Sequence, residues 1–136
     1  MALMRAREAV MREFRPRLAT HDLTEQQWGV LRALNAQQTA LTTRELSEMT
    51  FLLSPSLSRI TANLANRGLL NREANPSDQR SSLLSLSQDG KILLSSMAAE
   101  SESGYRAIEE SFGRDRLEML YNLLDGLAAT PIAKDT

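Results

Sequence analysis

Hydrophobic residues recur every three or four positions along most of the chain, which is the spacing of one face of a helix. At the amino end this pattern predicts a helix over residues 1–17, and Pro16 is expected to kink or end it. The apolar stripe of this first helix consists of Leu3, Ala6, Val10 and Phe14. A polar break, ATHD, separates it from the next periodic segment.

The segment LTEQQWGVLRAL predicts a second helix whose start is marked by its polar residues. Thr24 is a suitable N-cap, and Gln27 three residues later completes a capping box. Trp28, Leu31 and Leu34 share one side of this helix, so we expect them to face the core. A short extended piece around TALT follows.

The next segment, TTRELSEM, predicts a short third helix in which Thr42 and Glu45 repeat the capping pattern. Leu46 and Met49 are spaced so that both are expected to face inward. The residues TFLL then form a turn that leads into another helix. Two helices joined by so short a turn are typical of a helix-turn-helix.

Helix-boundary residues delimit the fourth helix, SPSLSRITANLANRG, at both ends and predict its span as residues 54–67. Ser54 is expected to be the N-cap, Pro55 the first helical residue, and Gly68 the residue just past the end. Leu57, Ile60 and Leu64 form its apolar stripe. The chain therefore continues beyond Gly68 in a different structure.

Residues 69–86 have the pattern of a β-hairpin, with apolar and polar residues alternating in a strand beside a polar turn. Leu84 and Leu86 stand two apart, as a half-buried strand requires, and NPSDQRSS forms a polar tip that carries Arg80. A long helix from Ser87, an interruption at Gly113 and a last helix complete the chain. The predicted fold is mainly α with a small β-wing, in one domain of residues 1–136.

Composition excludes several classes of function. The chain has 136 residues with 42% hydrophobic content, no cysteine and one histidine, His21. It shows no apolar run long enough for a membrane span, no signal peptide, and no phosphate-binding or nucleophile motif. We therefore expect a cytoplasmic protein that is not an enzyme and needs no cofactor or metal.

The charge distribution is more informative than the net charge of -1. Residues 1–21 carry +3, residues 22–53 carry -2, residues 54–87 carry +2 and residues 88–136 carry -4. The fourth helix and the hairpin are thus locally basic. This charge favours contact with the phosphates of nucleic acid.

The face of the fourth helix opposite its apolar stripe also favours contact with DNA. It presents Ser56, Arg59, Ala62, Asn63 and Asn66, with Ser58 beside them. A solvated face usually holds Glu and Lys, whereas short polar side chains can approach a base edge closely. The alternative interpretation is an ordinary solvated helix face.

The order of helix, strand, helix, turn, helix and hairpin over residues 24–87 is that of a winged helix-turn-helix. The fourth helix would enter the major groove of double-stranded DNA, and the hairpin would be a wing flanking it. Arg80 at the wing tip would then meet phosphates or the neighbouring minor groove.

The chain resembles the MarR family of bacterial transcription regulators over nearly its whole length. The resemblance is carried by LTEQQWGVLRAL, ELSEM and SPSLSRITANLANRGLLNREANPSDQRSSLLSLSQDGKILL, and its most specific part is the wing motif of Asp78 and Arg80. The form of MREFRPRL before LTEQQWGVLRAL further resembles the branch that regulates homoprotocatechuate (hydroxyphenylacetate) degradation operons.

The resemblance implies an obligate homodimer in which residues 1–19 and 88–128 form dimerisation helices. It implies a recognition helix at 54–67 and a wing at 69–86 on each subunit, which together bind a palindromic operator. In this interpretation Asp78 orients the wing and Arg80 contacts DNA; the alternative is a surface ion pair worth ~0–1 kcal/mol. The expected DNA-contacting residues are Ser54, Ser56, Ser58, Arg59, Asn63, Asp78 and Arg80.

The resemblance also implies a ligand pocket between the dimerisation helices and the winged domain. Trp28 and Arg32 share a helix face next to Glu25, and with Arg15 and Tyr105 they are the expected ligand-binding residues. A ring and a guanidinium on one face suit a small aromatic carboxylate. The alternative is that Trp28 is a core residue and Arg32 forms a salt bridge.

Two functional hypotheses follow. The first is a repressor of an aromatic-acid catabolic operon that a small phenolic or aromatic carboxylate releases from its operator. The second is a winged-helix dimer that acts as a protein-interaction module, without a response to DNA or ligand.

Overall fold

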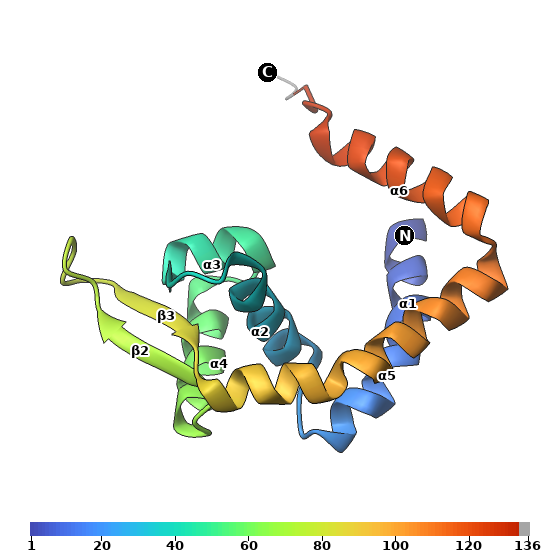
Figure 1. Ribbon diagram of the computed structural model, residues 1–136. Helices are drawn as coiled ribbons and strands as arrows, with labels where there is room; N and C mark the ends of the chain where they lie inside the picture. Colours follow the sequence, from blue (N-terminus) through green and yellow to red (C-terminus); the bar gives the residue numbers. More distant parts are fainter. Residues whose placement is uncertain (134–136) are drawn as a thin grey trace. The chain divides into compact units, whose positions relative to one another are not determined.

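The computed structural model describes residues 1–133, so the last three positions of the expected 1–136 domain lie outside the described residues. The described chain forms two compact units, Met1–Ala99 and the residues from Glu100 onward. Each unit is described by itself below. The first unit contains the elements that were expected to bind DNA (Figure 1).

Helix α1 spans Ala2–Thr20 and passes through Pro16, so this proline does not end the helix. A proline inside a helix removes one backbone hydrogen bond, here the one that the carbonyl group of Arg12 would accept. Arg12 and Pro16 are both exposed, so water can replace that bond. Phe14 and Leu18 are each 3% exposed and anchor the helix on both sides of the proline.

Helix α2 spans Glu25–Gln37 and begins with the expected capping box. The backbone N–H of Gln27 donates to Thr24 Oγ1 over 3.1 Å, and the backbone N–H of Thr24 donates to Gln27 Oε1 over 2.9 Å. The expected core side of this helix is confirmed. Its buried residues are Trp28, Val30, Leu31 and Leu34.

Helix α3 spans Thr43–Thr50, and Thr42 caps it by accepting a 3.1 Å hydrogen bond from the backbone N–H of Glu45. Leu46 faces inward as expected and is fully buried. Met49 does not, because its side chain is 37% exposed. The helix ends at Phe51, whose backbone is left-handed and whose ring is 90% exposed.

Helix α4 spans Ser54–Asn66, and its first helical residue is Ser54 rather than the expected Pro55. Leu53, not Ser54, is the N-cap, since its carbonyl accepts the first helical hydrogen bond from Leu57 over 2.9 Å. No side chain caps this end. Pro55 therefore lies in the second helical position, where its missing N–H still removes no helical bond.

The buried side of α4 also differs slightly from the expected stripe. Leu57 and Leu64 are fully buried, but Ile60 is only half-buried. The third buried residue of the helix is Thr61, which is 1% exposed. The hydroxyl of Thr61 accepts a 3.2 Å hydrogen bond from Nη2 of Arg72. A buried hydroxyl is thus paired with the strand that follows.

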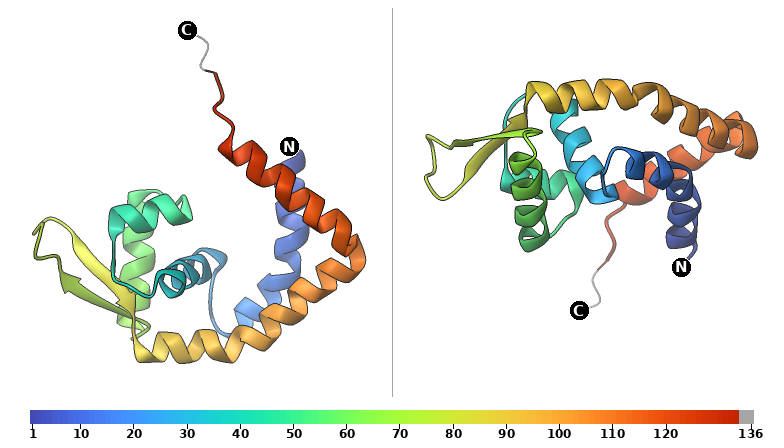
Figure 2. Two further views of the ribbon diagram at one scale, coloured as in Figure 1. Left: turned by 45° about the horizontal axis from the view of Figure 1, so that its top comes forward. Right: turned by 90° about the horizontal axis from the view of Figure 1, so that it is seen from below.

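Three strands form an antiparallel sheet with the order β1-β3-β2. They are β1 (Leu41–Thr42), β2 (Leu70–Ala74) and β3 (Ser82–Leu86). Leu84 pairs with Leu41 on one side and Arg72 on the other, and Leu84 and Leu86 are buried, as their alternation predicted. Figure 1 and Figure 2 show the β2–β3 hairpin projecting beyond α3 and α4.

Helix α5 spans Gln88–Phe112, with residues 88–99 in the first unit and the rest in the second. Its start packs tightly: a Cβ atom on Gly90 would lie 2.3 Å from the carbonyl oxygen of Leu69. Gly113, with a φ of +100°, separates α5 from α6, which spans Arg114–Ala129. The chain is mainly helical with a small β-wing, and no helix among residues 1–133 has the length and apolarity that crossing a membrane requires.

Candidate nucleic-acid interface and ligand pocket

The polar face of α4 is open to solvent beside the amino end of α2. Ser54, Ser58, Arg59 and Asn63 are exposed and Ser56 is half-buried. Three of these side chains line one surface hollow of about 400 Å³ together with residues of α2 and of the turn before α4. The hollow is lined by Thr24, Gln26, Gln27, Leu52, Ser56, Arg59, Ile60 and Asn63.

A hydrogen bond joins α2 to α4 at the edge of this hollow. Gln27 Nε2 donates to Asn63 Oδ1 over 3.0 Å. Gln27 thus uses both ends of its amide, because its oxygen already completes the capping box with Thr24. Sequence reasoning identified the cap but missed this second bond, since nothing in the spacing places Asn63 beside it.

The wing tip is organised by its own polar side chains. Asp78 Oδ1 accepts a 2.9 Å hydrogen bond from the backbone N–H of Arg80, and Asn75 Oδ1 accepts one of 3.0 Å from the backbone N–H of Ser77. Within residues 1–133 the carboxylate of Asp78 forms no ion pair with the Arg80 guanidinium. Asp78 therefore shapes the turn while the side chain of Arg80 remains exposed.

A second hollow, of about 300 Å³, brings together three of the five expected ligand-binding residues. Glu25, Trp28 and Arg32 all line it. Its remaining lining comes from α1, α2, the end of α3 and the turn before α4, namely Arg7, Met11, Gln26, Gly29, Met49, Thr50 and Leu52. We refer to it below as the Trp28 pocket.

Arg15 is not among the lining residues of the Trp28 pocket. Arg15 lies behind Glu25, with Nη2 at 3.3 Å from Glu25 Oε2. Tyr105 belongs to the second compact unit, where it is 39% exposed. Arg15 therefore acts on this pocket only through Glu25.

Trp28 combines the two interpretations given to it. Its indole is only 6% exposed and stacks on Phe14, so it is a core residue, and it also lines the pocket. The guanidinium carbon of Arg32 lies 4.7 Å from the centroid of the indole ring, which is a cation–π contact. The ion pairs found within residues 1–133 do not include Arg32, so the expected alternative of a salt bridge is not observed.

Two arginines of α1 neutralise Glu25, the acidic residue of the pocket. Glu25 is contacted by both Arg7 and Arg15. Arg15 also holds Glu8 with two hydrogen bonds of 2.6 and 2.8 Å, which lower the pKa of that carboxyl and raise the pKa of the guanidinium. The lining residues Arg7, Glu25 and Arg32 sum to one positive charge, which suits a monoanionic ligand.

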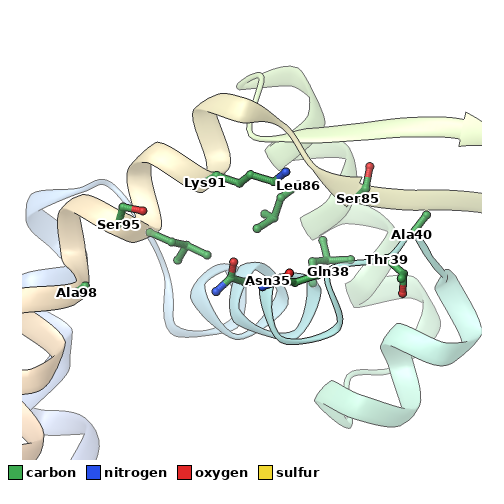
Figure 3. A pocket seen from close by; sticks show the side chains of 11 residues that line it. Asn35, Gln38, Thr39, Ala40, Ser85, Leu86, Lys91, Ser95 and Ala98 are labelled. Atoms are coloured by element: carbon green, nitrogen blue, oxygen red, sulfur yellow. The ribbon is translucent and has the colours of Figure 1, made fainter.

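The largest hollow described, of about 540 Å³, lies between the end of α2, strand β3 and the start of α5. Figure 3 shows Lys91 of α5 and Asn35 of α2 on opposite sides of it. Lys91 is its one charged lining residue, and none of the expected ligand-binding residues lines it. A small anion is therefore compatible with this hollow too. Residues 1–133 contain no group of three acidic, histidine or cysteine side chains that could hold a metal ion.

Comparison with known proteins identifies the family. Residues 21–81 match the model of the MarR family. The homoprotocatechuate degradative operon repressor of Escherichia coli is 36% identical over 129 residues, which cover 95% of this chain and 86% of that protein. The chain belongs to the MarR family of transcriptional regulators.

Two further relatives extend the likeness of this MarR-family chain. The transcriptional regulator FarR of Neisseria gonorrhoeae is 38% identical over 94% of this chain and 87% of its own length. The crystal structure of NadR in complex with 4-hydroxyphenylacetate shares 36% identity and a TM-score of 0.81, covering 96% of this chain and 92% of that one. The winged-helix fold expected from the sequence is thereby confirmed.

In this MarR-family regulator, several residues that line the hollow beside α4 and the Trp28 pocket were not predicted from the sequence. Thr24 was interpreted only as a helix cap and Gln26 was given no role, yet both line the hollow beside α4. Met11 and Thr50 of the Trp28 pocket carry no chemical signal in the sequence. Their positions depend on how helices pack, and no short-range pattern encodes that.

Proposed function

We propose that this regulator is a homodimeric repressor that binds a palindromic operator and is released from it by a small aromatic carboxylate. The observation that carries the proposal is the cluster of Ser56, Arg59 and Asn63 on the exposed side of α4, in the same compact unit as a wing whose tip presents an exposed Arg80. Short polar side chains and arginine are suited to base edges and phosphates. A regulator acting on the chromosome of a bacterial cell would work in the cytoplasm.

The proposed division of labour follows the sequence expectations. Residues 24–87 would bind DNA, with α4 in the major groove and the 69–86 hairpin as the wing; residues 1–19 and 88–128 would hold the dimer together. Exposed apolar side chains on α1 and α6 support this, because water disfavours such surfaces. They include Leu3, Met4, Val10, Met119, Tyr121, Leu123 and Leu127.

The Trp28 pocket is the proposed effector site. It offers the indole of Trp28, the guanidinium of Arg32 and one net positive charge, which together match an aromatic monocarboxylate. Two relatives support this class of ligand: one is named for homoprotocatechuate degradation, and NadR has been solved with 4-hydroxyphenylacetate. Arg15, Glu25 and Tyr105 remain proposed contributors, Arg15 through Glu25.

The pocket is also placed to affect DNA binding. Met49 and Thr50 at the end of α3, and Leu52 in the turn that leads into α4, line it together with Trp28 and Arg32 of α2. A ligand that fits the pocket better when α4 is displaced would lower the affinity for DNA by that difference in binding free energy.

The test is a titration of the protein–operator complex with 4-hydroxyphenylacetate and 3,4-dihydroxyphenylacetate. The wild type should release DNA, and Arg32→Ala should bind the acid about ten- to hundredfold more weakly, as expected for the loss of a charged hydrogen bond. Lys91→Gln is the matched control, because it removes a cation from the other hollow. Trp28 is the only tryptophan in the sequence, so its fluorescence reports binding without DNA.

Each outcome has a distinct meaning. If Lys91→Gln loses the response and Arg32→Ala keeps it, the effector binds in the larger hollow and the Trp28 pocket is not its site. If neither acid releases the wild-type complex at saturating concentration, the effector proposal is wrong. If the wild type binds no DNA from its own promoter region, the alternative of an interaction module gains support.

A further inference from the structure

The hydrogen-bonding capacity of each group determines the orientation of two side-chain amides at the junction of α2 and α4. A backbone N–H can only donate, so the Gln27 atom that faces the Thr24 N–H at 2.9 Å must be the oxygen. The other end of that amide is then the NH₂ group, which can only donate. The Asn63 atom 3.0 Å away must therefore be its oxygen, Oδ1.

This chain of constraints leaves the NH₂ group of Asn63 as the amide end directed away from α2. Asn63 is exposed, and it lines the same hollow as Ser56 and Arg59. Its free end is consequently a hydrogen-bond donor. An unconstrained asparagine could instead present its oxygen, its NH₂ group or both.

We propose that Gln27 is a specificity-determining residue that makes Asn63 a donor when it contacts DNA. The inference rests on the proposed function, since it concerns which base the DNA-bound protein prefers. Asparagine recognises adenine by using both amide atoms on one base edge, and in Asn63 the oxygen is already engaged by Gln27. The major-groove acceptors are O6 and N7 of guanine, O4 of thymine and N7 of adenine, but adenine also presents the N6 donor beside its N7. A donor alone therefore suits guanine and thymine best, because their hydrogen-bonding atoms in this groove are all acceptors.

A purely structural role for this bond would leave a different signature. A hydrogen bond between two partly exposed side chains contributes little to folding, because water can replace either partner. Its loss as a structural link would lower stability slightly and affect all operator sequences alike. A role in specificity changes the preferred base at one position of each half-site.

Gln27→Glu separates these two roles. A glutamate still offers an oxygen to the Thr24 N–H, so the capping box is retained. Its second oxygen cannot donate to Asn63, and the Asn63 amide must turn over to donate its own NH₂ group. The oxygen of Asn63 would then face the groove and select donor edges, namely N6 of adenine and N4 of cytosine.

Gln26→Glu is the matched control. Gln26 lines the same hollow and would bring the same negative charge toward the phosphates, but it has no part in the bond to Asn63. Both variants should bind DNA more weakly than the wild type. Only Gln27→Glu should also change the preferred base.

The experiment is selection of bound operators from a library randomised over the half-site, followed by affinity measurements on the selected sequences. The wild type should prefer guanine or thymine at the position that Asn63 contacts, and Gln27→Glu should reverse this preference toward adenine or cytosine by about fivefold or more. Asn63→Asp keeps an oxygen that accepts the hydrogen bond from Gln27, but it replaces the NH₂ group of Asn63 with a second oxygen. This variant should therefore lose the preference for guanine or thymine although Gln27 is unchanged.

Three results would overturn the inference. They are equal base preferences for Gln27→Glu and Gln26→Glu, a wild-type preference for adenine at the Asn63 position, and an unchanged preference in Asn63→Asp. A wild-type protein that binds no operator at all would instead overturn the proposed function, and the inference with it.

Discussion

The ring of Phe14 stacks on the indole of Trp28, with ring centroids 5.5 Å apart and an angle of 29° between the planes. This contact joins α1, a proposed dimerisation helix, to the helix that carries the Trp28 pocket. Phe14 is 3% exposed within its own chain, so it belongs to the core of the first unit as well as to the apolar stripe of α1. The packing of the pocket and the position of α1 therefore depend on one another.

Phe14→Ala should lower the free energy of unfolding by about 3–5 kcal/mol, because it leaves a cavity against the indole. Urea unfolding followed by the fluorescence of Trp28 would measure this change. Phe51→Ala is the matched control: its ring is 90% exposed, so the same substitution should change stability by at most about 0.5 kcal/mol. Equal effects of the two substitutions would contradict the burial described for Phe14.

Arg80→Ala should weaken operator binding without changing the dimer or its thermal midpoint. The side chain is exposed at the wing tip and makes no ion pair within residues 1–133, so folding gains little from it. The slope of the logarithm of the binding constant against the logarithm of the salt concentration should decrease in magnitude by ~1 for each phosphate contact removed. Gln79→Ala, at the neighbouring position, should leave the salt dependence unaltered. An unchanged slope in Arg80→Ala would remove the wing from the proposed interface.

Asp78→Ala should also weaken binding, but through the shape of the wing. Its carboxylate holds the backbone N–H of Arg80, and without it the tip loses the bond that orders the turn. Asp78→Asn retains an acceptor oxygen and should bind nearly as well as the wild type. Equal losses for the two variants, measured by mobility shift, would show that the charge of Asp78 matters rather than its hydrogen bond.

Aspartate at Leu3 and Val10 together should dissociate the dimer while the first unit remains folded. The two side chains are 58% and 38% exposed in the single chain, so their replacement removes little from its own core. Buried charges in an interface are strongly unfavourable. Light scattering would show the change in mass, and Arg44→Asp, an exposed position on α3, would control for altered charge. A double variant that remains dimeric would place the interface elsewhere.

Two glycines in helices should respond oppositely to alanine. Gly29 has open space around its Cβ position, so Gly29→Ala should stabilise α2 by about 0.5–1 kcal/mol. Gly90→Ala should destabilise the protein, since the new Cβ would lie 2.3 Å from the backbone oxygen of Leu69 and one of the two must move. Thermal unfolding would compare them. A stabilising Gly90→Ala would show that the start of α5 is packed more loosely than described.

Local sequence patterns were sufficient for most of the secondary structure. The capping box of Thr24 and Gln27, the alternation of Leu84 and Leu86, and the break at Gly113 are encoded within a few residues, and each is confirmed. The errors occurred where distant parts of the chain decide the outcome. Pro16 stays inside its helix because Phe14 and Leu18 are buried on both sides of it.

The candidate sites were less accessible to sequence reasoning for the same reason. Helical spacing placed Trp28 and Arg32 on one face, and the structure brings them into contact over 4.7 Å. Arg15 was assigned to the pocket, but it instead pairs with Glu8 and reaches the pocket only through Glu25. The bond between Gln27 and Asn63 spans 36 positions, and no local rule indicates a contact over that separation.

Helix α2 carries Gln27 and Trp28 at adjacent positions, and a step of 100° directs them to different sides. One side contacts α4, and the other lines the pocket with Arg32. In the proposed function, a single substitution at Gln27 would therefore alter the preferred operator without changing the effector, and one in the Trp28 pocket would do the reverse. After gene duplication, two copies of this chain could diverge in what they sense while continuing to control the same genes.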